Sequence, residues 1–203
     1  EIFARQAEKC KKPLILAINQ LDHEKANWEM ALESVKQTFG KKVLVIQYPI
    51  ETGVGFNSFI DVLKMKMYRF KDENGTREEL EIPADQADQA AELHQVVAEM
   101  AAENDEALME LFFDKGQLTE EEIRAGLRIG TAKAEIMPLF CLSGRKDIGV
   151  KRLMEFVINA APSPDKMVQM LKDGTTVPCD SAGQPSVFIY KTSVEQHLGD
   201  VSF

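Results

Sequence analysis

Two polar residues with the spacing Asn-x-x-Asp, Asn19 and Asp22, follow an apolar stretch near the start of the chain. An aspartate carboxylate accepts two N–H bonds from the N1 and N2 edge of guanine, and adenine does not offer that edge. An asparagine amide at this spacing braces its own loop and faces the N7 side of the purine. Discrimination is large when the wrong base leaves buried partners unpaired. The pair therefore indicates a loop that reads guanine.

The surrounding pattern places this loop at the end of a strand. Residues 14–18 are all apolar, which is typical of a central parallel strand buried on both faces. Amphipathic helices are expected over residues 2–10 and 28–39, the second ending at Gly40. Because α/β folds place ligands at the carboxyl ends of parallel strands, the loop lies where a ligand is expected. The alternative is that Asp22 only caps a helix after an ordinary strand.

Composition and charge narrow the class of protein. The chain has 203 residues, of which 44% are hydrophobic and 28% charged, with a formal net charge of −9. This acidic balance argues against direct, sequence-specific binding of nucleic acid. No apolar run approaches the ~18 residues of a membrane-spanning helix. The start of the chain has neither an initiator Met nor a signal-peptide pattern, so we expect a piece of a longer protein.

Cysteine and histidine usage predicts no metal site and a cytoplasmic protein. The three cysteines are few and widely spaced, which favours a reducing compartment. No group of Cys and His residues has the spacing of metal ligands. These residues are Cys10, Cys141, Cys179, His23, His94 and His197.

The middle of the chain departs from the alternation of strand and helix. The expected strands are residues 42–48, 56–63, 65–70 and 78–82, with a hairpin turn at 72–75 before the last of them. Helical periodicity covers residues 83–113 with a break near Asn104, and Thr119-x-x-Glu122 predicts a capping box that begins the next helix. A buried strand over residues 136–142 and a helix over 150–160 then resume the α/β pattern.

The chain is expected to divide into three parts. Residues 1–42 and 131–164 are expected to share one parallel α/β sheet, and residues 43–130 form an inserted α+β subdomain. Residues 165–203 are expected to be a linker and the first strand of a further β-barrel domain, since the strand over 186–193 has no obvious partner downstream.

One helical face of the insert is strongly acidic. A basic partner would be attracted to such a face, although a solvated surface is the simpler interpretation. We define the acidic face by Asp85, Asp88, Glu92, Glu99 and Glu103.

The motifs together resemble those of translational GTPases. The segment Asn19-Gln20-Leu21-Asp22 resembles their fourth guanine-binding motif, Asn-Lys-x-Asp, and Ser143-Gly144 resembles the fifth, Ser-Ala. The long segment between them resembles the inserted subdomain of bacterial elongation factor G. Further similarity lies in Phe59–Lys66, Ile82–Ala84, Glu106–Glu110, Leu118–Ile123, Gly149-Val150 and Pro162–Pro164.

The resemblance implies a fold, a ligand and a partner. The fold would be the C-terminal part of a P-loop GTPase domain with its inserted subdomain, followed by the start of a β-barrel. The guanine-binding residues would be Asn19, Gln20, Asp22, Ser143 and Gly144, with the Gly144 N–H donating to the guanine carbonyl oxygen. The family hydrolyses GTP to GDP with Mg²⁺, promotes ribosomal translocation and takes part in ribosome recycling. The insert is thought to meet the ribosomal stalk protein, for which the acidic face is the candidate surface.

Two departures and one absence qualify this resemblance. Gln20 replaces the family Lys, and Gly144 replaces the family Ala, which loosens the loop. No Gly-x-x-x-x-Gly-Lys-[Ser/Thr] phosphate loop occurs in the sequence, so catalytic residues and Mg²⁺ ligands are expected outside it. The chain by itself is expected neither to hydrolyse GTP nor to bind it tightly.

A second hypothesis comes from another class. The chain would then be a non-enzymatic interaction module that binds a ribosomal partner through the acidic face without nucleotide chemistry. An unrelated α/β enzyme fits less well, because the sequence has no Ser/His/Asp order and no glycine fingerprint.

Overall fold

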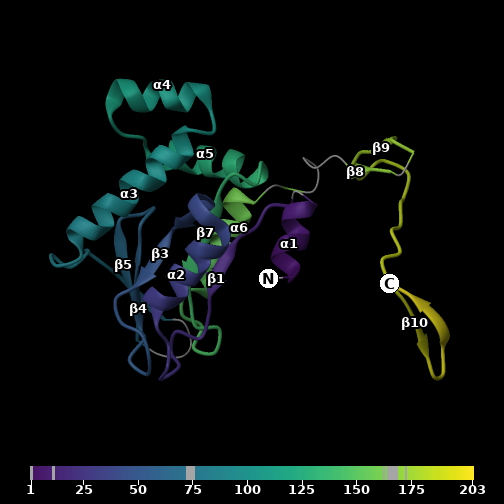
Figure 1. The fold of residues 1–203 in the computed structure, drawn as a ribbon, viewed down its shortest axis with the longest axis horizontal. Helices are drawn as coiled ribbons and strands as arrows, with labels where there is room; N and C mark the ends of the chain where they lie inside the picture. The colour runs from purple at the N-terminus through teal and green to yellow at the C-terminus, as the bar shows by residue number, and fades with distance from the viewer. Residues whose placement is uncertain (1, 11, 72–75, 162, 164–168, 172) are drawn as a thin grey trace. The chain divides into compact units, whose positions relative to one another are not determined.

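A computed structural model of the chain describes residues 2–10, 12–71, 76–161, 163, 169–171 and 173–203. Two compact units make up the chain, Glu1–Pro162 and Ser163–Phe203. The expected hairpin turn at residues 72–75 and the prolines at 162 and 164 lie outside the described residues. The fold is a mixture of α and β elements with one parallel and one four-stranded antiparallel sheet in the first unit (Figure 1).

The parallel sheet has the strand order β1-β7-β2. Its strands are β1 (Leu16–Ile18), β2 (Val43–Val45) and β7 (Met137–Cys141). The central strand β7 is buried along its whole length. The prediction that residues 14–18 form a central strand buried on both faces is wrong. Only β7 pairs with β1 among the described strands, and Ala17 is exposed.

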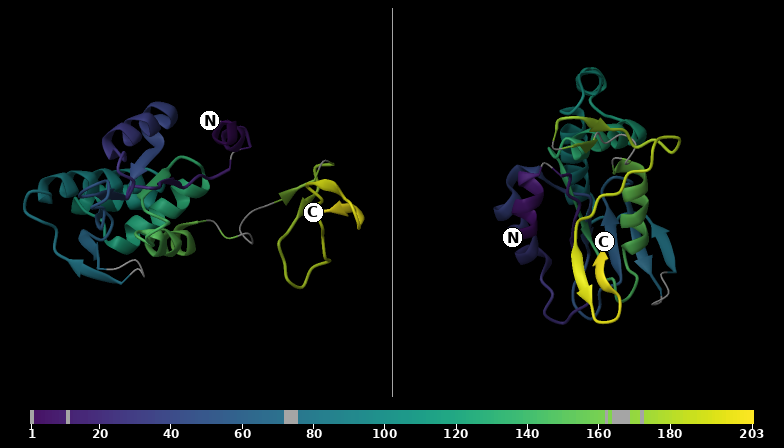
Figure 2. Two further views of the ribbon diagram at one scale, coloured as in Figure 1. Left: turned by 90° about the horizontal axis from the view of Figure 1, so that it is seen from below. Right: turned by 90° about the vertical axis from the view of Figure 1, so that its right-hand side faces the viewer.

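Helices cover both faces of this sheet. They are α2 (Trp28–Phe39) and α6 (Val150–Ala160), which lie on opposite sides (Figure 2), and α1 (Ile2–Lys9) precedes β1 in the chain. The Asn27 side chain accepts a hydrogen bond from Met30 N–H and so caps the start of α2. Gly40, at φ +66°, ends this helix as predicted. Phe156 of α6 packs edge-on against Phe140 of β7, with ring centroids 5.0 Å apart.

The antiparallel sheet is continuous with the parallel sheet through the β2–β3 segment. Its strands, in spatial order, are β3 (Gln47–Pro49), β4 (Ser58–Asp61), β5 (Lys66–Phe70) and β6 (Arg77–Leu80). Between β2 and β3, Ile46 donates its N–H to Leu139 O and accepts from Val62 N–H, each at 2.9 Å. One extended segment thus belongs to both sheets. Residues 43–45, assigned from sequence to the insert, are part of the parallel sheet.

Three helices complete the inserted segment. They are α3 (Ala87–Ala102), α4 (Glu106–Lys115) and α5 (Glu120–Ala132). The break expected near Asn104 separates α3 from α4, with Asp105 as the cap of α4. The predicted capping box is confirmed, because Thr119 and Glu122 bond to each other's backbone N–H. Helix α4 lies at the top of Figure 1, beyond α3 and α5.

The second unit consists of two short hairpins. They are β8 (Gln169–Met170) with β9 (Thr176–Val177), and β10 (Thr192–Glu195) with β11 (Gly199–Ser202). The expectation of one strand over residues 186–193 without a downstream partner is wrong. Gly199, at φ +72°, permits the tight return that brings β11 back along β10. No described helix is long and apolar enough to cross a membrane.

Candidate functional site

The two motifs singled out from the sequence, at residues 19–22 and 143–144, meet at one edge of the parallel sheet. Strands β1 and β7 run parallel with Ile18 opposite Cys141, so the residues that follow each strand leave the sheet together. We name residues 19–27 the base loop and residues 143–148 the second loop. Two backbone bonds extend the pairing past the strands, from Leu142 N–H to Ile18 O at 3.0 Å and from Leu21 N–H to Leu142 O at 3.3 Å.

Asn19 joins the two loops. Its Oδ1 accepts the N–H of Gln20 at 2.7 Å and the N–H of Gly144 at 3.0 Å. This is the bracing role that the sequence assigned to the Asn. It also changes one expectation, since the Gly144 N–H assigned to a guanine carbonyl donates to Asn19 in this structure.

Asp22 is held by the second loop. A hydrogen bond from the Ser143 side chain is the main reason why the pKa of Asp22 lies below its ordinary value of 3.8, with Lys146 and Arg145 adding positive charge. Ser143 is fully buried and its Oγ accepts the N–H of Lys146 at 3.2 Å. The lowered pKa favours the ionised carboxylate, which suits an acceptor of two N–H bonds.

Gln20 takes a strained backbone conformation beside this pair. Its φ is +62° in the left-handed region, which is uncommon for a residue other than glycine. Such residues occur preferentially at ligand sites, where the surrounding contacts hold them in place. The side chain is exposed, and a cavity of about 230 Å³ lies along the base loop. Ile18, Asn19, Gln20, Leu21, His23, Lys25, Ala26, Asn27 and Ala31 line the cavity.

A third segment, which sequence reasoning did not assign to the site, also contacts the base loop. The turn of residues 52–54 lies between β3 and β4, and Gly53 N–H donates to Leu21 O at 2.8 Å. From the second loop, Lys146 Nζ donates to Val54 O at 3.3 Å. The sequence showed only that residues 52–55 favour a turn.

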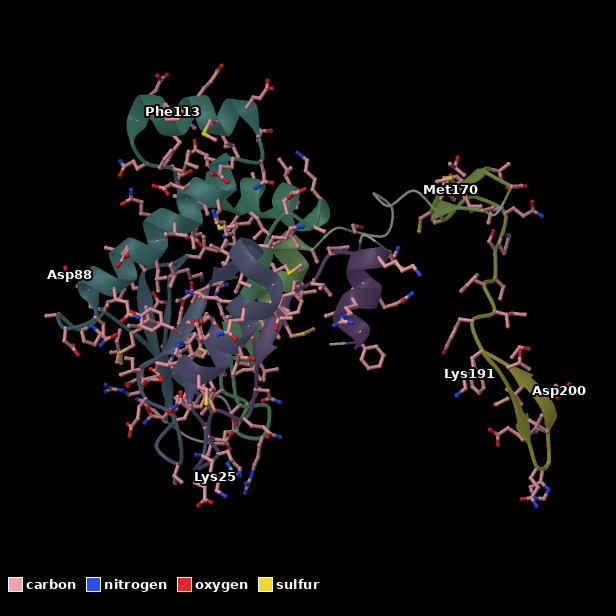
Figure 3. All side chains as sticks on the ribbon, viewed as in Figure 1. Lys25, Asp88, Phe113, Met170, Lys191 and Asp200 are labelled. Atoms are coloured by element: carbon pink, nitrogen blue, oxygen red, sulfur yellow. The ribbon has the colours of Figure 1, made fainter. Side chains whose placement is uncertain are left out.

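The remaining features singled out from sequence lie elsewhere. The five residues of the acidic face are exposed, and Figure 3 shows Asp88 well away from Lys25 of the base loop. Trp28 is 5% exposed, so it packs in the core next to the base loop. No three His, Cys, Asp or Glu side chains within the described ranges come together as metal ligands.

Comparison with known proteins identifies a related fold. No protein-family model matches the chain. The chain is similar to the crystal structure of ttk003000868 from Thermus thermophilus, with 27% sequence identity and a TM-score of 0.78. The match covers 98% of this chain and 28% of that one. This chain therefore shares its fold with a part of the Thermus protein.

Proposed function

We propose that this chain is the base-reading part of an elongation factor G-like translational GTPase, with GTP or GDP as its ligand. The guanine-binding residues are Asn19, Gln20, Asp22, Ser143 and Gly144. The observation that carries the proposal is the hydrogen bond from Gly144 N–H to Asn19 Oδ1, which joins two motifs 125 residues apart. A helix-capping Asp after an ordinary strand does not require such a partner.

Four of these residues have distinct roles in this proposal, and Gly144 donates its N–H to Asn19 Oδ1. Asp22 accepts the N1 and N2 hydrogens of guanine, and Ser143 keeps its carboxylate ionised and oriented. Asn19 fixes the base loop to the second loop. Gln20 covers the base with a shorter, uncharged side chain than the Lys of the family motif.

Hydrolysis of GTP belongs to the longer protein. The sequence contains no phosphate loop, and positioning of phosphates and Mg²⁺ is most of the chemistry in phosphoryl transfer. We therefore propose cytoplasmic GTP hydrolysis and ribosomal translocation for the longer protein and no turnover for this chain.

The acidic face is the proposed surface for the ribosomal stalk protein. Its five carboxylates form no ion pair with a Lys or Arg in the described part of the chain, so their charge is available to a basic partner. The same observation favours the alternative function, a non-enzymatic interaction module. Guanine binding separates the two.

A test of the proposed function is NMR titration of the chain with guanosine, adenosine and xanthosine. Guanosine is expected to shift the amide signals of residues 19–22 and 143–144, and adenosine is not. Asp22→Asn replaces an acceptor by an amide whose N–H matches the C2 carbonyl of xanthine, so preference should move to xanthosine. Equal responses to guanosine and adenosine would refute the proposal, and a reversal of preference cannot result from unfolding.

A further inference from the structure

The turn of residues 52–54 supports the base loop through backbone contacts. Gly53 N–H donates to Leu21 O at 2.8 Å, and Gly53 O accepts Phe56 N–H at 2.9 Å. Leu21 and Phe56 are each 1% exposed. The carbonyl of Leu21 precedes Asp22 directly, so the position of this bond sets the direction in which the Asp22 carboxylate leaves the backbone.

Thr52 holds the far end of the same loop. Its Oγ1 donates to Ala26 O at 3.2 Å, and Thr52 is partly buried. The peptide between Ala26 and Asn27 leads into the cap of α2, so this bond fixes where the base loop ends. The two bonds together span the loop on either side of Asp22.

The position of Gly53 allows this close approach. Its φ is +90°, a conformation that residues with a Cβ rarely adopt. A Cβ at this position would lie 3.9 Å from His23 O and 4.0 Å from Glu24 O. Space is therefore sufficient and the backbone angle is the constraint.

The turn is attached to a rigid support. It joins β3 to β4, and β3 continues from β2 of the parallel sheet. On β4, Asp61 is fully buried and accepts from Arg152 Nε of α6 at 2.6 Å. The antiparallel sheet is therefore held to the parallel sheet by the β2–β3 continuation and to α6 by the Asp61–Arg152 pair. The 52–54 turn, which this sheet supports, in turn holds the base loop in place.

We propose that Thr52 and Gly53 are positioning residues for guanine recognition, through which the inserted subdomain sets the geometry of the base loop. The inference rests on the proposed guanine-reading role of Asn19 and Asp22. By linkage, occupation of the base loop and the stability of the 52–54 turn favour each other.

The discriminating variant is Thr52→Val, which keeps the shape of the side chain and removes the hydroxyl. Thr52→Ser retains the hydroxyl and serves as the conservative rescue. Thr38→Val is the matched control, because Thr38 Oγ1 donates to Ser34 O within α2 and not to a residue of the base loop. Gly53→Ala perturbs the bond from Gly53 N–H to Leu21 O. Gly116→Ala is its control, because Gly116 also has a positive φ, of +71°.

The readout is the ratio of guanosine to inosine affinity, measured by NMR titration of the full chain. Inosine lacks the 2-amino group, so the ratio reports how well Asp22 meets both N–H groups. A variant that merely unfolds part of the sample lowers both affinities equally and leaves the ratio unchanged. We expect Thr52→Val to weaken guanosine binding about threefold to tenfold, as for one lost hydrogen bond, and to reduce the ratio.

The outcomes separate the two proposals. Unchanged affinity and ratio in both Thr52→Val and Gly53→Ala would overturn the positioning role and leave the guanine site standing. No preference for guanosine over adenosine in the unmodified chain would overturn both. The inference is supported if the guanosine-to-inosine ratio falls in Thr52→Val and is unchanged in Thr52→Ser and Thr38→Val. The ratio should also fall further in Gly53→Ala than in Gly116→Ala.

Discussion

At the scale of single residues, the candidate site depends on side chains that hold one another in place. Asn19 bonds to the backbone of both loops, and Ser143 bonds to Asp22. Asn19 is exposed, so these bonds keep a surface side chain in place, whereas Ser143 is buried. Side chains that hold one another in this way are the kind of preorganisation that binding sites use.

Gly144 is predicted to tolerate and benefit from a methyl group. Its backbone is not in the left-handed region, and a Cβ would meet the Asn19 amide at 3.7 Å, an ordinary contact. Gly144→Ala should therefore raise the free energy of unfolding by about 0.4–1 kcal/mol, by restricting the unfolded chain.

Chemical denaturation measures this change. The contrast is Gly40→Ala, where space is open but φ is +66°, and a loss of about 1 kcal/mol is expected. A loss of stability in Gly144→Ala would contradict the backbone conformation described for this loop.

Ser143→Ala is predicted to raise the pKa of Asp22. The Ser143 hydrogen bond favours the ionised carboxylate, so the native pKa lies below 3.8. A lowered native pKa stabilises the fold above the unfolded value, and this stability is lost as the pH falls through the native value. In the variant, this pH-dependent stability should be smaller, because the native pKa of Asp22 lies closer to the unfolded value.

NMR titration of the Asp22 carboxyl carbon in both proteins measures this shift directly. Asp173 provides a control, because its pKa is lowered mainly by Thr175 in the other unit and should not change. An unchanged Asp22 pKa would show that Ser143 is not its partner.

At the scale of elements, the insert is assembled by a close crossing of α3 and α5. The crossing uses small, buried residues, with Ala98, Ala101 and Ala102 on α3 and Gly126 on α5, where Gly126 lies against Ala101. Small side chains let the two backbones approach closely. Helix propensity alone would disfavour glycine in the middle of α5, so packing decided these positions.

Gly126→Ala is predicted to destabilise the first unit although alanine is the better helix former. A Cβ would lie 2.3 Å from Ala101 O and 2.7 Å from Ala101 C, so backbone must move. Overpacking of this kind costs about 1–3 kcal/mol, more than the propensity gain of about 1 kcal/mol.

Thermal and denaturant unfolding measure the effect. The control is Gly55→Ala, where the three atoms nearest to a Cβ belong to the flexible carboxylate of Glu51, and a change within about 0.5 kcal/mol is expected. Equal effects of the two substitutions would mean that α3 and α5 can separate freely.

At the scale of the whole first unit, one buried ion pair joins the parallel sheet to the inserted segment. Arg152 of α6 is 3% exposed and Asp61 of β4 is fully buried. Asp61 also accepts Lys64 N–H at 2.9 Å and Gln47 Nε2 at 3.4 Å. A buried charge of this kind is tolerated only while every partner is present.

Arg152→Met is predicted to lower the free energy of unfolding by about 3–5 kcal/mol, because it leaves the Asp61 carboxylate buried without a counter-charge. Arg124→Met is the matched control, since Arg124 pairs with Glu120 on the surface of α5. That pair should contribute only about 0.3–0.5 kcal/mol.

Denaturant unfolding of both variants tests the prediction. Equal small losses would show that Asp61 gains another partner or a proton when Arg152 is removed. A concerted unfolding of both sheets in Arg152→Met would agree with the extended segment that belongs to both.

Much of this architecture was readable from local sequence. The capping box at Thr119, the end of α2 at Gly40 and the break between α3 and α4 depend on hydrogen bonds within a few residues, which sequence specifies directly. The Asn19 and Asp22 pair was found for the same reason, since both side chains follow one strand.

Features that depend on contacts between distant segments became visible only in the tertiary structure. An apolar run such as residues 14–18 has the same pattern in a central or an edge strand, and only the order β1-β7-β2 places it at an edge. The contacts of Thr52 and Gly53 with the base loop join segments about 26 residues apart or more, with no local signature beyond a turn. Local sequence predicted where the helices form and which residues are candidates for the site. The fold determined which of those residues meet, because hydrogen bonds between distant segments exist only once the two sheets are assembled.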